Sequence, residues 1–191
     1  MNSDRDPGPH RPRLVILDRD GVINRDSDDY IKSPAEWEPL PGSLAAIAAL
    51  NQAGFTVVIA SNQSGLGRGL FTADDLDAIH RKMRDAITAA GGRLDGIYYC
   101  PHRPEDNCDC RKPRAGLLKR IAADFDTGLT GVPIIGDSGR DLDAARAVGA
   151  RPILVRTGNG EQTLRNYPDP DGIEVYADLA AAAQALIAGV H

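Results

Sequence analysis

Short apolar runs alternate with longer amphipathic segments along most of the chain, and this alternation limits the possible folds more than any other feature. Apolar runs typical of buried strands occupy residues 13–17, 56–60, 96–100, 132–135 and 152–155. Apolar residues at helical spacing occupy residues 44–53, 73–90, 116–125, 141–148 and 178–187. Strands that alternate with helices form a parallel sheet covered on both faces, so we expect an α/β, Rossmann-like fold.

Size and charge narrow the class of protein. The 191 residues suffice for one domain with a substantial core, which we assign to residues 13–191, and residues 1–12 are expected to form a disordered leader. The net charge of −5 argues against general nucleic-acid binding. No apolar stretch has the length of a membrane span, and no signal region is recognisable. We therefore expect a cytoplasmic monomer without a nucleic-acid or membrane partner.

Two aspartates directly follow the first apolar run. Asp18 and Asp20 come after residues 14–17, and Gly21 follows them. Charges just after a strand of an open α/β sheet lie at its carboxyl end, where such sheets bind ligands. Glycine permits a sharp turn that brings backbone N–H groups close to a bound group. On spacing alone, solvated charges at a strand exit are an equally good interpretation.

Polar residues also follow the next predicted strands, and in a parallel sheet they would all meet at one edge. They are Ser61, Asn62, Gln63 and Ser64 after the second strand, Arg111 and Lys112 after the third, and Asp137 and Ser138 after the fourth. Each group alone is as typical of a turn or a helix cap. Together they form a chemical set suited to phosphoryl transfer.

Each charged side chain of this set has a distinct expected role. Asp18 can attack phosphorus and form an acyl phosphate; Asp20 can protonate the leaving oxygen and then activate water, for which its pKa would have to rise. Clustered carboxylates need a shared cation, and hard oxygen ligands select Mg²⁺. We expect catalytic magnesium at Asp18 and Asp137 with a backbone carbonyl, and count Asp20 in the same metal site. Lys112 and the Ser61 hydroxyl would offset charge on the phosphoryl oxygens.

All 3 cysteines lie in one short segment together with a histidine. Cys100, His102, Cys108 and Cys110 are the usual donor set of a structural Zn²⁺ site, in which four ligands leave no open position. A disulfide and a chance cluster are the alternatives, but disulfides are rare in the cytosol and one thiol would stay unpaired. We therefore expect structural zinc. The loop ends just before Lys112 and would fix where that side chain points.

The four motifs also carry a resemblance. Asp-x-Asp-Gly, Ser-Asn-Gln, Arg-Lys-Pro and Gly-Asp-x-x-x-Asp occur in the order found in the haloacid dehalogenase superfamily, which the chain resembles from residue 13 onward. In that superfamily the aspartate at the position of Asp20 marks phosphatases. No long insertion follows the first motif or separates the second from the third. The resemblance therefore implies a capless fold, with the zinc-binding loop as one wall of an open active site.

The cysteine loop resembles two phosphatase families, the D-glycero-D-manno-heptose-1,7-bisphosphate 7-phosphatases and the histidinol-phosphate phosphatases. Residues 17–24, 62–69, 95–102 and 154–158 resemble the heptose family, whereas the short spacing from His102 to Cys108 also occurs in the histidinol family. The first resemblance implies removal of the 7-phosphate of a small phosphorylated sugar, in synthesis of the lipopolysaccharide core precursor. Its implied substrate contacts are Asp26, Asp29, Asn62, Gln63, Ser64, Arg111 and Ser138.

Three alternative functions stay open. A histidinol-phosphate phosphatase is the nearest of them. A nucleic-acid 3′-phosphatase would suit a capless site that admits a polymer end, although the chain lacks a basic stripe. A non-catalytic zinc-binding interaction module would tolerate Asp18→Asn, which an aspartate nucleophile would not.

Overall fold

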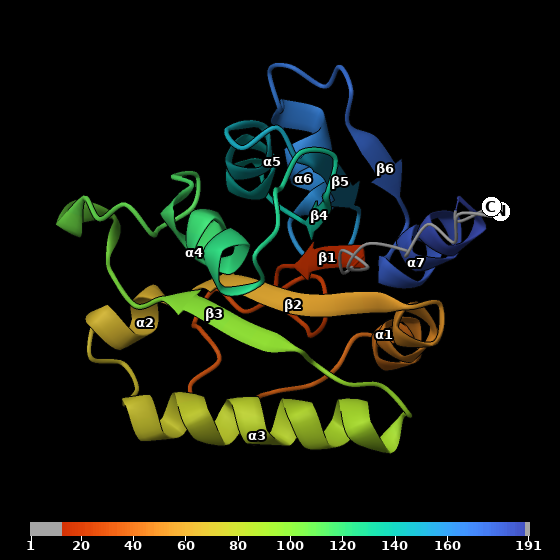
Figure 1. The fold of residues 1–191 in the computed structure, drawn as a ribbon. Helices are drawn as coiled ribbons and strands as arrows, with labels where there is room; N and C mark the ends of the chain where they lie inside the picture. Colours follow the sequence, from red (N-terminus) through yellow and green to blue (C-terminus); the bar gives the residue numbers. More distant parts are fainter. Residues whose placement is uncertain (1–12, 190–191) are drawn as a thin grey trace, which may run out of the picture.

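A single parallel sheet organises the chain. The computed structural model describes residues 13–189, so the leader expected at residues 1–12 lies outside the described range. Six strands, all paired in parallel, follow the order β3-β2-β1-β4-β5-β6 (Figure 1). Their bounds are β1 Arg13–Leu17, β2 Phe55–Asn62, β3 Gly96–Cys100, β4 Pro133–Gly136, β5 Arg151–Val155 and β6 Glu174–Tyr176. The predicted α/β architecture is confirmed.

Helices cover both faces of this sheet. Their bounds are α1 Ser43–Gln52, α2 Ser64–Gly67, α3 Ala73–Ala89, α4 Gly116–Asp124, α5 Gly139–Arg146, α6 Gly160–Asn166 and α7 Leu179–Ala188, with a 3₁₀ turn, η1, at Pro104–Asp106. Apolar residues of α1, α3 and α7 share one buried cluster, and those of α4 and α5 share another. Figure 1 shows α3 and α4 on opposite sides of the sheet.

The central strand β1 explains why the sheet must be covered twice. Val15 and Leu17 belong to the cluster under α1, α3 and α7, whereas Leu14 and Ile16 belong to the cluster under α4 and α5. Successive side chains of a strand point to opposite faces, so an uninterrupted apolar run is buried only when both faces are packed. All four side chains are at most 3% exposed.

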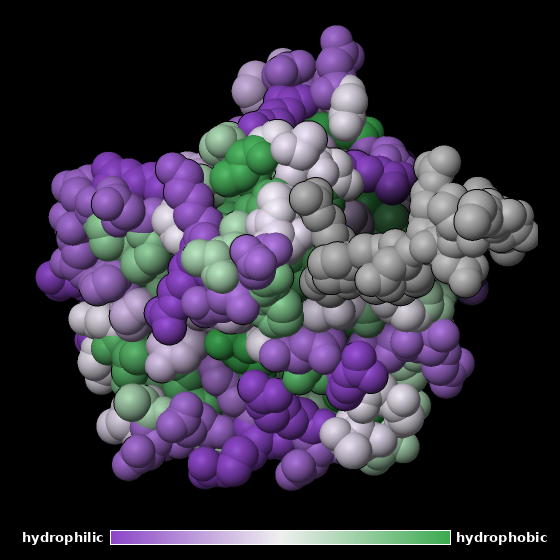
Figure 2. Space-filling model, viewed as in Figure 1, coloured by the Kyte–Doolittle hydropathy of each residue, from purple (hydrophilic) through white to green (hydrophobic). Residues whose placement is uncertain are grey.

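Helix α3 has one face buried in the core and one face exposed, as its amphipathic pattern predicts. Thr72 caps its first turn by accepting a hydrogen bond from the Asp75 N–H, while the Asp75 carboxylate accepts one from the Thr72 N–H, as the capping-box pattern predicts. Ile79 and Met83 pack into the core at 0% exposure. The outward face of α3, at the bottom of Figure 2, is mainly hydrophilic. Among residues 13–189, no helix has the length and apolarity needed to cross a membrane.

Four short elements were not predicted from the sequence: α2, η1, α6 and β6. Each has at most seven residues, too few for a hydrophobic period to emerge. The described segment from residue 18 to residue 42 contains no helix, and only α2 lies between β2 and α3. No cap domain covers the carboxyl edge of the sheet in the described residues, which agrees with the expected capless fold.

Candidate active site

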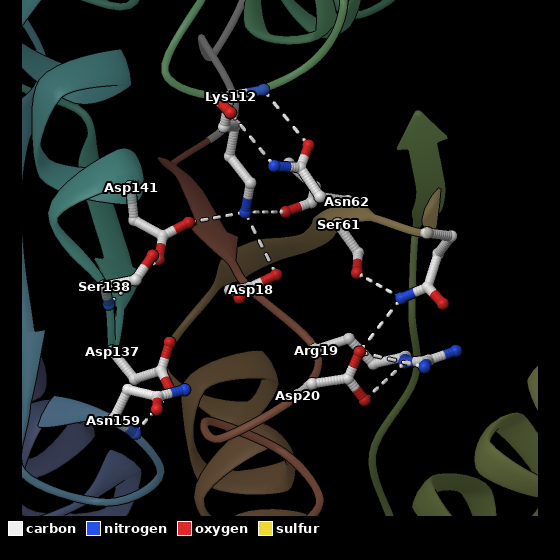
Figure 3. Close-up of polar contacts among 12 residues, drawn as sticks. Asp18, Arg19, Asp20, Ser61, Asn62, Lys112, Asp137, Ser138, Asp141 and Asn159 are labelled. Carbon is white, nitrogen blue, oxygen red and sulfur yellow. Dashed lines mark hydrogen bonds and ion pairs between the residues drawn. The ribbon is translucent and has the colours of Figure 1, made fainter. Parts of the chain in front are cut away.

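A cavity of about 360 Å³ opens where β1, β2 and β4 end. It brings together most residues predicted from the sequence: Asp18, Asp20, Asp26, Ser61, Asn62, Gln63, Ser64, Arg111, Lys112, Asp137 and Ser138. Because the strands are parallel, their carboxyl ends lie at one edge, and side chains distant in sequence converge there (Figure 3).

Lys112 lies at the centre of this cavity and is 3% exposed. Its Nζ is 3.0 Å from Asp18 Oδ1, and it donates hydrogen bonds to Asp141 Oδ1 and to the Ala60 carbonyl. Burial alone would lower the pKa of Lys112, but the charges of Asp141 and Asp18 outweigh it and raise the pKa. The side chain is therefore a fixed cation. Asp141 closes the fourth motif, yet its buried ion pair was not among the predicted site contacts.

Three carboxylates crowd the same side of the cavity. Oxygens of Asp18, Asp137 and Asp141 lie within 4.8 Å of one another. Burial, followed by repulsion from Asp141 and Asp20, raises the pKa of Asp18 to about 7 although Lys112 opposes the shift. Burial and repulsion from Asp18 raise the pKa of Asp137 to about 8. Such mutual repulsion is what a bound divalent cation relieves, and the oxygen donors suit Mg²⁺.

Asp137 is held from the side opposite Lys112. The Asn159 N–H donates to Asp137 Oδ2 at 2.8 Å, and the Asn159 amide donates to Asp26 Oδ2 at 2.8 Å. Gly21 has φ +76°, and a Cβ there would lie 2.1 Å from Asp137 Oδ2, so the turn after β1 must be glycine. Asn159 was not among the predicted site residues, because it lies one residue beyond the stretch 154–158 and asparagine after glycine is also typical of an ordinary loop.

Asp20 lies in a different environment. Arg19 donates from Nε to Oδ1 at 3.0 Å and from Nη2 to Oδ2 at 2.9 Å, while the amides of Asn24 and Gln63 donate to Oδ1 at 2.8 Å and to Oδ2 at 3.0 Å. Burial would raise the pKa of Asp20, but the Arg19 charge and the amide hydrogen bonds outweigh it, so the pKa lies below its ordinary value. In the described structure this carboxylate is separate from the Asp18 cluster (Figure 3).

Several predicted substrate contacts are hydrogen-bonded to residues with a predicted catalytic role or to Asp141 beside them. Asn62 exchanges two hydrogen bonds with the Lys112 backbone, at 3.0 and 3.1 Å, and so fixes the loop that carries the lysine. The Ser138 N–H donates to Asp141 Oδ2 at 3.1 Å. The Gln63 amide, 4% exposed, donates both to Asp20 and to Ser61 Oγ, the latter at 2.7 Å.

Asp29, one of the predicted substrate contacts, is exposed and does not line the cavity. Its N–H donates to Ser27 Oγ at 3.2 Å and its carbonyl accepts from Lys32 Nζ at 2.7 Å. Ser27 and Asp28 line the cavity together with Asp26. A substrate contact by Asp29 stays a prediction.

The cysteine loop forms a compact cluster at the end of β3. Cys110 Sγ lies 3.2 Å from Cys100 Sγ and 3.5 Å from Cys108 Sγ, and His102 Nδ1 lies 3.3 Å from Cys110 Sγ. Donors around a tetrahedral Zn²⁺ would be about 3.5 to 3.8 Å apart, so the four groups need to move by only a few tenths of an ångström. Arg111 Nη1 donates to the His102 carbonyl at 3.3 Å, which connects the loop to the cavity.

Known proteins resemble this chain over nearly all of its length. Residues 14–140 match the family model for polynucleotide kinase 3 phosphatase, and residues 109–182 match a HAD-hydrolase-like model. A D-glycero-beta-D-manno-heptose-1,7-bisphosphate 7-phosphatase of Bordetella bronchiseptica is 55% identical over 92% of this chain and 98% of its own. The enzyme of that name from Pseudomonas aeruginosa is 52% identical over 91% and 97%.

Structural similarity agrees with these sequence relationships. The crystal structure of the D,D-heptose 1,7-bisphosphate phosphatase from B. bronchiseptica, complexed with magnesium and phosphate, superposes with a TM-score of 0.90 at 55% identity. It covers 92% of this chain and 98% of the crystallised one.

Proposed function

This chain belongs to the D-glycero-D-manno-heptose-1,7-bisphosphate 7-phosphatase family of the haloacid dehalogenase superfamily, and on that basis we propose that it removes the 7-phosphate of D-glycero-β-D-manno-heptose 1,7-bisphosphate. The observation that carries the proposal is the grouping of Asp18, Lys112 and Asp137 at the carboxyl edge of the sheet. A buried cation beside clustered carboxylates is suited to phosphoryl transfer.

Asp18 is the nucleophile in this proposal. Its oxygen attacks phosphorus, the bond from phosphorus to the O7 of the sugar breaks, and an aspartyl phosphate forms. Lys112 stays protonated throughout and offsets charge on the phosphoryl oxygens, aided by the Ser61 hydroxyl. Asp141 keeps the Lys112 ammonium pointed at Asp18.

Magnesium is the proposed cofactor of this step. The side chains of Asp18 and Asp137 would hold the ion, together with the backbone carbonyl of Asp20 rather than its carboxylate, which is engaged elsewhere. The ion neutralises charge and orients the phosphoryl group when bound. The Asn159 N–H leaves one oxygen of Asp137 free for such a ligand.

Asp20 is the proposed acid and base. It protonates O7 as that oxygen leaves, and it then takes a proton from the water that attacks the aspartyl phosphate. In the free chain the carboxylate is ionised because Arg19 lowers its pKa. Arrival of a phosphate dianion nearby favours the protonated form through like-charge repulsion, which supplies the acid for the first step.

The remainder of the sugar phosphate would occupy the outer cavity. Arg111 is the proposed fork for the second phosphate or a sugar hydroxyl, and Ser64 and Ser138 offer hydroxyls beside it. Asp26, held by Asn159, is placed to accept from sugar hydroxyls on the opposite wall.

Zinc is the proposed structural ion of the cysteine loop. The ligand set and its spacing support a closed site of three thiolates and one imidazole. Through the hydrogen bond from Arg111 to the His102 carbonyl, an ordered loop would also hold this substrate-binding arginine. Metal analysis of the purified protein tests the proposal. One zinc ion per chain would support it, and a protein without zinc would refute it.

A heptose bisphosphate phosphatase of this kind would act in the cytoplasm as a monomer, in synthesis of the lipopolysaccharide core precursor. The names of the relatives give the heptose bisphosphate as substrate, and the pathway role rests on the family resemblance. Gel filtration with light scattering tests the monomer, since a dimer would elute at twice the mass of 20.4 kDa.

Phosphate release from a substrate panel tests the reaction itself. With Mg²⁺ present, we expect heptose 1,7-bisphosphate to be hydrolysed at least about 100-fold more efficiently than histidinol phosphate, because only the bisphosphate can use both Lys112 and Arg111. Faster hydrolysis of histidinol phosphate would refute the substrate assignment.

A nucleic-acid 3′-phosphatase is the second candidate, because the polynucleotide kinase 3 phosphatase model matches residues 14–140. The acidic net charge of −5 and the acidic cavity wall at Asp26 and Asp28 disfavour a polyanion. An oligonucleotide with a 3′-phosphate belongs in the same panel. Its preferential hydrolysis, with binding that weakens steeply as salt rises, would favour this second function.

A further inference from the structure

A buried arginine lies between the two aspartates and takes no part in the steps described above. Arg19 is 1% exposed, and its guanidinium forms a two-pronged ion pair with Asp20. A charged side chain is rarely buried to this extent unless its position serves a purpose, since desolvation is costly. We propose that Arg19 is a positioning residue that fixes the plane of the Asp20 carboxylate for proton transfer. This inference rests on the acid–base role of Asp20 proposed above.

The contact geometry indicates that Arg19 orients the Asp20 carboxylate and does more than neutralise its charge. The two donors of Arg19 each contact a different oxygen, at 3.0 and 2.9 Å, and a planar fork of this kind matches only one orientation of the carboxylate plane. A single ammonium would leave the carboxylate free to rotate about its Cβ–Cγ bond. Asn24 and Gln63 add one hydrogen bond to each oxygen, so that rotation breaks several contacts at once. Each oxygen then accepts two hydrogen bonds, and a proton that binds to Asp20 must displace one of these donors while the remaining contacts keep the carboxylate plane in place.

The backbone around Arg19 is also immobilised. Its carbonyl accepts hydrogen bonds from the Ile23 N–H at 2.8 Å and the Asn24 N–H at 3.2 Å, which close the turn after β1. Positioning by Arg19 therefore starts from an anchored main chain, and the Asn24 that closes this turn is the same residue that contacts Asp20 Oδ1.

A neighbouring histidine adds no positive charge near Arg19. His80 of α3 is 7% exposed and packs against the Tyr99 ring with centroids 5.7 Å apart. Burial, together with the charge of Arg19, lowers the pKa of His80 to about 4. The imidazole is therefore neutral near pH 7 and does not repel the guanidinium.

Leaving-group dependence distinguishes this role from a structural one. An alkyl phosphate such as heptose bisphosphate or glycerol phosphate needs a proton on its leaving oxygen, whereas p-nitrophenyl phosphate expels a stabilised anion and does not. In the holoenzyme with Mg²⁺, Arg19→Met should lower the turnover of alkyl phosphates about 100-fold, the size of a general-acid contribution. The first equivalent of nitrophenolate should still be released within about threefold of the wild-type rate.

That first equivalent should then be followed by slow turnover, because hydrolysis of the aspartyl phosphate needs Asp20 as a base. The test compares the ratio of two rates, that of the first nitrophenyl phosphate turnover and that of alkyl ester turnover. Both rates scale with the amount of folded enzyme, so partial misfolding leaves the ratio unchanged and cannot mimic the result. Arg93→Met, at a surface arginine paired with Asp95, is the matched control and should leave both rates unchanged.

Arg19→Lys separates orientation from charge. It keeps the positive charge but loses the fork, so we expect the selective loss on alkyl phosphates to persist at about tenfold or more. Equal losses on both esters in Arg19→Met, no loss, or full rescue by lysine would each overturn the proposal. If the wild-type enzyme hydrolyses glycerol phosphate but not heptose bisphosphate, the substrate assignment fails while the Arg19 comparison still stands. A wild-type chain inactive on every ester would overturn both.

Discussion

Asp18 and Asp20 are separated by one residue, yet their surroundings shift the pKa values of the two carboxyl groups in opposite directions. Asp18 shares its surroundings with Asp137 and Asp141, and its pKa is raised to about 7 by burial and like charge. Asp20 accepts hydrogen bonds from Arg19 and two amides, and its pKa is lowered despite burial. Identical residues thus acquire different chemistry from what surrounds them. The three carboxylates around Asp18 outnumber the single charge of Lys112 and favour a further bound cation, whereas the single carboxylate of Asp20 is already paired with Arg19.

Removing the two carboxylates one at a time gives the largest contrast. Asp18→Asn should lower phosphate release from heptose bisphosphate by about 10⁴-fold or more, because the nucleophile is lost. Asp20→Asn should lower it by roughly 10² to 10⁴-fold, as expected for loss of acid–base catalysis. Rates at saturating substrate, with circular dichroism as the folding control, measure both. An Asp18→Asn enzyme that keeps a few per cent of activity would contradict the assignment.

The dependence of stability on pH should report the carboxylates around Asp18. In the absence of metal, the folded chain holds protons on Asp18 and Asp137 above the ordinary carboxyl pKa of 3.8. The folded state then binds more protons than the unfolded state, so the free energy of unfolding should fall as pH rises from about 4 to about 8. The fall should be at most about 1.4 kcal/mol per pH unit for each group.

Urea denaturation at several pH values measures this slope, and added Mg²⁺ should flatten it by binding the ionised cluster. Asp20 and His80 contribute in the opposite sense. The lowered pKa of Asp20 makes the folded state more stable above pH 4 than below it, and the lowered pKa of His80 makes stability rise between about pH 4 and pH 6.5. Metal-free stability that rises between pH 6.5 and pH 8, above the range of His80, would refute the raised pKa values of Asp18 and Asp137.

Disruption of the cysteine cluster should lower stability clearly, and it should lower turnover far less than Asp18→Asn does. Cys110→Ser should abolish zinc binding and lower the melting temperature by about 10 °C, the shift that a loss of a few kcal/mol gives in a chain of this size. Turnover should fall by about tenfold, because the loop holds Arg111 and precedes Lys112 but contributes no reacting group. Calorimetry and metal analysis measure the first effects. Loss of activity comparable to that of Asp18→Asn would assign this cluster to the chemistry instead.

The acidic loop should give the smallest effects. Asp26→Asn should raise the KM for the bisphosphate severalfold with little change in kcat, because Asp26 lines the cavity and shares Asn159 with Asp137. Asp29→Asn, three residues away and turned to solvent, is the matched comparison and should stay within about twofold of wild type. Steady-state kinetics of the two variants decide which of the two carboxylates contacts the substrate, and an Asp29→Asn effect as large as that of Asp26→Asn would support both contacts expected from the sequence.

The sequence was informative where strands end. Each apolar run determines where the polar residues after it lie, so the order of residues alone predicts Asp18, Ser61, Lys112 and Asp137 at one edge of the sheet. The contacts that give these residues their properties were not predictable in this way. Asn159 reaches Asp137 from a loop without a motif, and the four hydrogen bonds to Asp20 come from three different side chains.

The pKa of Asp20 shows the same limit. An acid role for Asp20 requires its pKa to rise, and the sequence could not show whether it does; the neighbouring Arg19 and the amide hydrogen bonds lower the pKa in the free chain although burial opposes them. Sequence spacing places a charge near a carboxylate without showing which way the guanidinium turns. Nor does spacing show that Asp26 and Asp28 line the cavity while Asp29 does not.

Chemical trapping of the phosphorylated enzyme tests most directly whether the two aspartates have the separate roles described here. Enzyme mixed with heptose bisphosphate and Mg²⁺ is quenched during turnover, treated with sodium borohydride, and digested for peptide mass spectrometry. Borohydride reduces an aspartyl phosphate to homoserine, so homoserine should appear at position 18 and not at position 20. Homoserine at position 20, or an unmodified peptide from enzyme quenched during a measured burst of product, would contradict Asp18 as the nucleophile.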